Sequence, residues 1–239
     1  MRKLLYGAAL VCALPVPALA APGMGEEVYG ATVEKGEFEA EARYDRLSGG
    51  PDSGEDLLKL EAAYGVSSRL RLAATTELER EVGDKRRTEE IGIEAIYHLG
   101  RAGPIDFALY GEYAIGLNGN PDAVEGKLLM QHTSGPWDLR LNLIAEKELK
   151  GGEPVEFRYA ASADVEAFDE VRLGVQAFGD LGTTHKFLPY AEHFIGPAAK
   201  VEVEGLGPEL GLEVGYLFAV GKAREDTKGQ LRVALELEF

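Results

Sequence analysis

Two polar residues near the middle of the chain have types and spacing suited to hydrolysis. His132 and Ser134 are separated by one residue, so on a strand both side chains would share one face, as a general base and its nucleophile require. The predicted register instead puts both at a short turn, while the nearest asparagine, Asn142, points into the interior. Because a catalytic triad needs convergent geometry, a lipase-like enzyme is the third of our hypotheses. We expect no catalytic residues.

A second group of polar residues could bind a metal ion. His185 and His193 share one long predicted loop with Glu192 and Asp180. Two histidines in a flexible loop are usually solvated, and three methionines without a His or Cys cluster offer few soft ligands for copper. We therefore expect neither a metal site nor a cofactor.

The N-terminal residues are typical of a secretory signal peptide. Arg2 and Lys3 precede an apolar stretch over 4–16, and Ala18 and Ala20 precede the expected cleavage point. The stretch is too short for a membrane-spanning helix, and nothing later approaches the roughly 18 apolar residues that such a helix needs. Any membrane span must therefore be built from strands. We assign 1–20 to the signal peptide.

The remaining chain is strongly acidic. The signal segment holds two of the 25 basic residues and none of the 41 acidic ones, so 23 basic residues face 41 acidic ones and the net charge is −18. Nucleic acid is therefore an unsuitable partner. The charges alternate with apolar residues rather than forming blocks, which argues against disorder.

Alternation of apolar and polar residues recurs along the rest of the chain and predicts strands. The clearest segments are 69–78, 90–99, 137–145 and 155–165. We predict about twelve strands, an even number as single-chain outer-membrane barrels require. Their approximate spans are 32–46, 55–66, 69–80, 87–99, 104–117, 123–133, 136–147, 153–165, 168–179, 193–204, 208–219 and 229–239.

The predicted connections alternate in length. Every second one is short, while the others are mostly longer and rich in Gly, Pro and charge. Outer-membrane barrels alternate short periplasmic turns with longer external loops in this way. The last strand ends on Phe239, which we interpret as an assembly signal. The fold class is therefore an all-β, antiparallel transmembrane barrel over 32–239, preceded by a short periplasmic segment over 21–31 that is too short to form a plug domain.

The opposite parity of these strands predicts a charged interior. Burying so many ions without water or partners would cost several kcal/mol for each unpaired charge. The interior must be water-filled, densely ion-paired, or both, so an open pore and a closed salt-bridge network remain equal alternatives. The candidate lumen-lining residues are Glu37, Glu39, Glu41, Arg69, Arg71, Glu94, Glu112, Arg140, Arg158, Arg172, Glu213, Arg232 and Glu236.

Several short motifs resemble a known family. Tyr64-Gly65-Val66-Ser67 leading into RLRLAA, the HFIGP stretch at 193–197 and the closing strand pair are similar to those of outer-membrane barrels described as phenol-degradation meta-pathway proteins or transporters. The resemblance implies a barrel of this size that transports small, including hydrophobic, compounds and carries no catalytic residues. Copper-resistance barrels look similar but have a Met- and His-rich leader that is missing here. The spacing of His132 and Ser134 matches that of a twelve-stranded outer-membrane phospholipase.

These observations predict a passive channel or porin-like transporter in the cell outer membrane of a Gram-negative bacterium. An acid-rich lumen would favour cations among small solutes. The alternative is a barrel with a closed lumen and a structural or interaction role. The expected partners are outer-membrane lipids and, through the C-terminal strand, the barrel assembly machinery.

Overall fold

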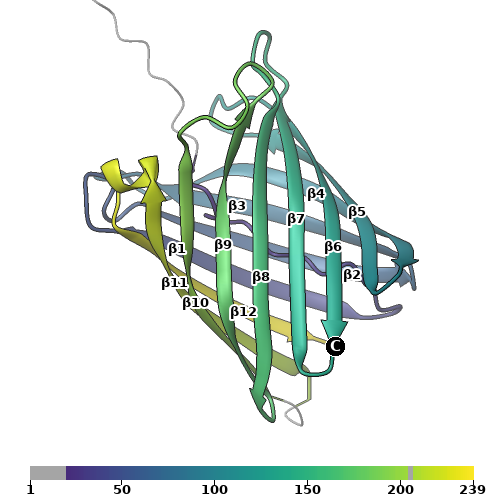
Figure 1. The fold of residues 1–239 in the computed structure, drawn as a ribbon. Helices are drawn as coiled ribbons and strands as arrows, with labels where there is room; N and C mark the ends of the chain where they lie inside the picture. Colours follow the sequence, from purple (N-terminus) through teal and green to yellow (C-terminus); the bar gives the residue numbers. More distant parts are fainter. Residues whose placement is uncertain (1–19, 204–206) are drawn as a thin grey trace, which may run out of the picture.

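The computed structural model is a closed barrel of twelve antiparallel strands (Figure 1). It describes residues 20–203 and 207–239, so most of the predicted signal peptide lies outside the described residues. Each strand pairs with its neighbours in sequence, and β1 pairs with β12 to close the wall. A single 3-10 turn, Lys222–Glu225, precedes the last strand. The strands are β1 Phe38–Ser48, β2 Asp56–Ser67, β3 Leu70–Arg80, β4 Arg87–Ala102, β5 Ile105–Gly116, β6 Ala123–Ser134, β7 Trp137–Glu148, β8 Glu156–Phe168, β9 Val171–Thr183, β10 Glu192–Val203, β11 Glu209–Gly221 and β12 Gly229–Glu238.

The strand count and the all-β fold class are confirmed. Alternation predicted most strand ends to within a few residues, because in a barrel wall the side-chain parity is constrained along the whole strand. The main difference is β1, which begins at Phe38 and not at residue 32. Residues 32–37 instead connect the wall to a segment inside the barrel.

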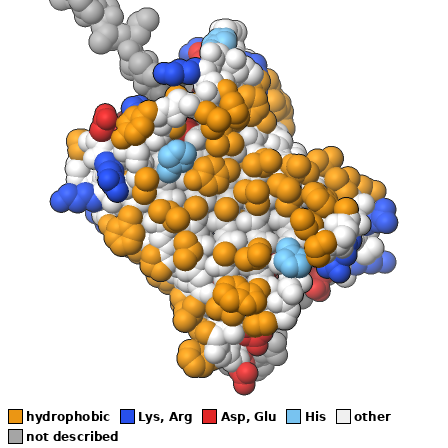
Figure 2. Space-filling model, in the orientation of Figure 1, with side chains coloured by type: hydrophobic (Ala, Val, Ile, Leu, Met, Phe, Trp, Pro, Cys, Tyr) orange, Lys and Arg blue, Asp and Glu red, His pale blue; other side chains and the backbone are white. Residues whose placement is uncertain are grey.

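Large apolar side chains cover the outer surface of the wall (Figure 2). Ile93 and Leu109 are examples, 68% and 49% exposed. A soluble protein rarely leaves so many such residues exposed, whereas a barrel in a bilayer needs an apolar outer band. Among the described residues, no helix is long and apolar enough to cross a membrane.

Residues 20–37 thread through the barrel interior and are called the lumenal segment below (dark purple in Figure 1). Near its start, Gly25 hydrogen-bonds to Asp45, close to the long connection after β1. Near its end, Gly36 hydrogen-bonds to the Gly65 carbonyl, close to the short turn after β2. The segment therefore runs from the long-loop end of the barrel to the short-turn end.

This placement differs from the prediction that residues 21–31 lie in the periplasm. The physical reason is the size of the interior, because a barrel of twelve strands leaves more space than its own side chains fill. Two apolar clusters fix the segment there. Val28 packs with Leu47, Phe178 and other wall residues, while Tyr29 and Ala31 belong to a second cluster.

Candidate pore and the segment that occupies it

Side chains of the barrel wall bind the main chain of the lumenal segment. The Tyr29 N–H donates to Asn142 Oδ1 at 2.8 Å, and Asn142 Nδ2 donates to the Tyr29 carbonyl at 3.0 Å. The Ala31 N–H donates to Gln131 Oε1 at 2.9 Å, and His98 Nδ1 lies 2.6 Å from the Ala31 carbonyl oxygen. Amide side chains therefore do here what a neighbouring strand does in a sheet.

Arginines of the wall perform the same task at other residues of the segment. Arg232 donates to the carbonyls of Gly23 and Glu26, and its guanidinium lies 4.3 Å from the centre of the Phe178 ring. Arg140 donates to the Val28 carbonyl at 3.3 Å. Charge-assisted hydrogen bonds of this kind are roughly twice as strong as neutral ones.

One lysine connects the lumenal segment to the wall through side chains. Lys127 forms ion pairs with Glu26 and, at 3.1 Å, with Glu125. Its ammonium lies 4.8 Å from the centre of the Tyr29 ring and 4.4 Å from that of Tyr110, within cation–π range. The Lys127 side chain is 2% exposed, so these interactions are shielded from water.

The wall itself carries a chain of buried ion pairs. Lys59 lies 3.1 Å from Glu94, and Arg71 lies 2.7 Å from Glu39 and 2.5 Å from Glu61. The Tyr29 hydroxyl donates to Glu94 at 3.1 Å, which joins the lumenal segment to this chain. Charges buried at this depth are tolerated because each has a partner of opposite sign.

Two polar cavities remain on either side of the lumenal segment. The short-turn chamber, near Tyr64 and Glu238, has a volume of about 350 Å³. The long-loop chamber, near Asn120 and Glu148, has a volume of about 210 Å³. Different stretches of the lumenal segment line the two chambers: residues 20 and 24–26 line the long-loop chamber, and residues 27–30, 32–34 and 37 line the short-turn chamber.

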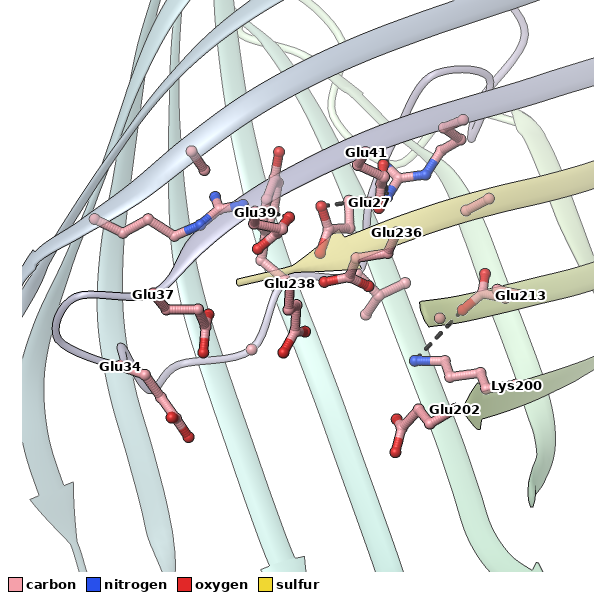
Figure 3. Close-up of a pocket in the computed structure, with 18 of the residues that line it drawn as sticks. Glu27, Glu34, Glu37, Glu39, Glu41, Lys200, Glu202, Glu213, Glu236 and Glu238 are labelled. Atoms are coloured by element: carbon pink, nitrogen blue, oxygen red, sulfur yellow. Dashed lines mark hydrogen bonds and ion pairs between the residues drawn. The ribbon is translucent and has the colours of Figure 1, made fainter. Parts of the chain in front are cut away.

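Both chambers are acidic. Ten carboxylates and five cationic side chains line the short-turn chamber, and nine carboxylates and three cationic side chains line the long-loop chamber. Figure 3 shows the acidic side chains of β1 and β12 converging from the wall of the short-turn chamber. Across the β1–β12 pair, Glu39 lies opposite Glu238 and Glu41 lies opposite Glu236. Like charges directly opposite each other are destabilising, which disfavours a state in which all four carboxylates are charged and no cation lies near them. Cations should be enriched in such a space.

Glu37 marks the mouth of the short-turn chamber, just before β1 (Figure 3). Partial burial raises the pKa of its carboxyl to about 6, and the nearby carboxylates of Glu238 and Glu34 add to this effect. The charge of this mouth should therefore change between pH 5 and pH 7.

The structure places ten of the thirteen candidate lumen residues on the chamber walls. Glu94 is 1% exposed and lies among the ion pairs described above. Arg172 pairs with Asp164 beside the Pro136 carbonyl. The ten are Glu37, Glu39, Glu41, Arg71, Arg140, Glu213, Arg232 and Glu236 in the short-turn chamber, and Glu112 and Arg158 in the long-loop chamber.

Arg69 is the one candidate that is exposed in a turn and does not belong to a strand. It is exposed in the turn before β3, because that strand begins only at Leu70. Phe239 follows β12 and exchanges main-chain hydrogen bonds with Phe38, with the two rings 5.8 Å apart. Its role as an assembly signal stays a prediction.

In the part of the chain that the structure describes, no group of three or more His, Cys, Asp and Glu side chains is arranged to hold a metal ion. The candidate catalytic residues are engaged separately. His132 and Ser134 are exposed, and His132 Nδ1 contacts the Pro104 carbonyl at 2.8 Å, while Asn142 is engaged with Tyr29. His193 stacks on Tyr159 with ring centres 5.9 Å apart. Asn142, Gln131 and His98 are the functional side chains that sequence patterns missed as a group. For Asn142 and Gln131 the signal was an uncharged amide at an inward position of a strongly charged barrel.

Comparison with known proteins supports the fold. No protein-family model and no curated protein matches the sequence. Among solved structures, the KdgM porin has a TM-score of 0.56 at 11% identity, and the match covers 84% of this chain and 99% of the porin. The NanC porin has a TM-score of 0.57 at 10% identity, covering 84% and 98%. The COG4313 outer membrane channel from Pseudomonas putida F1 has a TM-score of 0.57 at 11% identity, covering 86% and 96%.

These likenesses show a shared fold with outer-membrane porins and channels.

Proposed function

We propose that this protein is an outer-membrane channel for small solutes, with a preference for cations, and that the lumenal segment closes it at rest. The observation that carries the proposal is the pair of acidic chambers separated by residues 20–37. The segment contributes no strand to the wall, because all twelve strands lie within residues 38–238. Its displacement would join the chambers without breaking the barrel.

A passive mode of transport fits the same features. The wall is complete without the segment, and the chambers are lined by fixed charges that favour ions of one sign. The resemblance to barrels described as phenol-degradation meta-pathway proteins adds small hydrophobic compounds to the candidate solutes. The apolar cluster around Val28 and Phe178 is buried while the segment is seated, so its wall residues would be exposed to such compounds once the segment has left. Outer-membrane lipids and the barrel assembly machinery are the partners that this role requires.

The second candidate is a permanently closed barrel with a structural or interaction role. The hydrogen bonds between wall side chains and the main chain of the segment, together with the Lys127 ion pairs, favour it specifically. The two proposals differ in one respect. A channel must have a second, conducting state in which the segment no longer blocks the lumen, whereas a permanently closed barrel has no such state.

The test compares the single-channel conductance of the chain from residue 21 with that of a variant lacking residues 21–31. Both proteins are refolded into planar bilayers, and heat-modifiable migration checks that each barrel is folded. We expect rare, small conductance steps for the full chain and frequent, larger, cation-selective steps for the variant. A folded variant that never conducts would favour the closed barrel.

A further inference from the structure

The lumenal segment is held in the way that a protein holds a peptide ligand. Nine of its main-chain groups contact seven side chains of the wall. They are the N–H groups of Gly25, Tyr29 and Ala31 and the carbonyls of Gly23, Gly25, Glu26, Val28, Tyr29 and Ala31, bound by Asp45, Asn142, Gln131, Arg232, Arg43, Arg140 and His98. These contacts are made to main-chain N–H and carbonyl groups, which are present in every peptide.

Asn142 gives the clearest case. Its amide donates to and accepts from the main chain of one residue, Tyr29, which is the pattern that adjacent strands use. Asn142 is 0% exposed and Gln131 is 9% exposed. When the segment leaves, Asn142 loses both of these bonds and Gln131 Oε1 loses its donor, while Gln131 Nε2 still donates to Asp138 at 3.0 Å. An amide group without a partner is destabilising. A second peptide could restore the same bonds.

The wall also recognises two kinds of side chain. Lys127 pairs with Glu26, and Arg43 lies 3.2 Å from Glu27, so two positions take acidic residues. The next aromatic position is filled by Tyr29, whose ring lies near Lys127 and whose hydroxyl donates to Glu94. The preferred sequence therefore combines two acidic residues with a tyrosine two positions further along.

We infer that the lumen is a binding site for short extended peptides and that residues 23–31 are a tethered ligand of this site. The inference rests on the proposed function only in that a free peptide reaches the site when the segment has left. It deepens that function by adding short acidic peptides, held at the cationic Lys127 and Arg43, to the small cations that the acidic chambers favour. Backbone contacts provide the affinity, and Lys127 and Arg43 provide the side-chain preference.

The test measures binding and needs no conductance. A fluorescein-labelled peptide with the sequence of residues 21–31 is titrated with the folded barrel lacking those residues in detergent, and fluorescence anisotropy is recorded. We expect saturable binding that an excess of unlabelled peptide reverses. Absence of saturable binding to a barrel shown to be folded would overturn the inference.

Two matched pairs test backbone recognition. N-methylation of the peptide at the tyrosine amide removes the bond to Asn142, and we expect binding to weaken about tenfold, whereas N-methylation at the residue equivalent to Glu27, whose amide makes none of the nine contacts, has little effect. In the barrel, Asn142→Leu should weaken binding similarly, and Asn118→Leu in an exposed loop should not. Equal effects within each pair would contradict the inference.

The two proposals fail separately. A variant that conducts but binds no peptide would retain the channel and remove the peptide site. A variant that binds peptide but does not conduct would retain the site and remove the channel.

Discussion

Lys127 takes part in several interactions at the lumenal segment, whereas each main-chain contact is a single hydrogen bond. It neutralises Glu26 of the segment and Glu125 of the wall, and two tyrosine rings flank its ammonium. With the lysine removed, Glu26 would stay buried without this ion pair, and Glu125 would keep only Arg158, at 2.9 Å. A buried ion pair that loses one partner is far more costly than an exposed one.

Lys127→Met should therefore lower the free energy of unfolding by about 3–5 kcal/mol and release the lumenal segment. The measurement is the urea midpoint of heat-modifiable migration, together with the frequency of large conductance steps. Lys222→Met is the control, because Lys222 forms an exposed ion pair with Glu192 at 3.4 Å. Its effect should stay within about 1 kcal/mol. Equal losses in the two variants would show that Lys127 has no special role.

Glu37 supplies a prediction about pH. Its pKa of about 6 lies above the usual value, so the carboxylate is charged above pH 6 and becomes neutral as the pH falls through 6. Cation preference in the variant lacking residues 21–31 should therefore decrease between pH 7.5 and pH 5. Reversal potentials in a salt gradient measure this. Glu37→Gln should lower the cation preference at pH 7.5 and reduce its change near pH 6. If the pH dependence of the cation preference is the same in this variant, groups other than Glu37 cause it.

At the scale of elements, the strands and the lumenal segment differ in how far the sequence reveals them. In a wall strand such as β3, side chains point alternately outward and inward, so the alternation of apolar and polar residues alone predicts the strand. The segment over residues 20–37 shows no such alternation, because its bonds reach side chains as remote as Arg232, 209 positions from Gly23. Its glycines and mixed polarity fit an ordinary linker equally well. The chamber residues were predictable from parity, but their division into two chambers depended on this segment.

The end of the segment is fixed by its contact with β2. Gly65 accepts a hydrogen bond from the Gly36 N–H at 2.7 Å, and a Cβ atom at Gly65 would lie 1.8 Å from the Glu34 carbonyl oxygen. Glycine is therefore required at this position while the segment is seated. No comparable neighbour lies within 4 Å of a Cβ added at Gly111, on β5.

Gly65→Ala should consequently displace the segment while leaving the wall closed. Overpacking of this kind costs about 1–3 kcal/mol, which corresponds to a change of about 5–150-fold in the population of the seated state. The measurement is the fraction of time spent in the larger conductance state. Gly111→Ala should match the unmodified chain. If the Gly65→Ala channel does not enter the larger conductance state more often, the segment must stay seated with a changed path past residue 65.

At the scale of the whole molecule, the barrel separates two environments. Apolar side chains cover the outer face that Figure 2 shows. The acidic chambers lie inside, so the large net negative charge is compatible with a bilayer around the barrel. Aromatic residues should lie near the edges of the apolar band, where amphipathic rings are favoured. Trp137, the only tryptophan, is 50% exposed at the start of β7, beside a short turn.

Trp137 therefore reports the depth of the barrel in a membrane without any substitution. After refolding into lipid vesicles, its fluorescence should shift to shorter wavelength, because the indole leaves water for the interfacial region. Lipids brominated near the headgroup should quench it more strongly than lipids brominated near the ends of the acyl chains. Stronger quenching from the chain ends would place the short turns deep in the bilayer, and the apolar band would then need a different alignment. Absence of quenching by both lipids would contradict insertion through this outer surface.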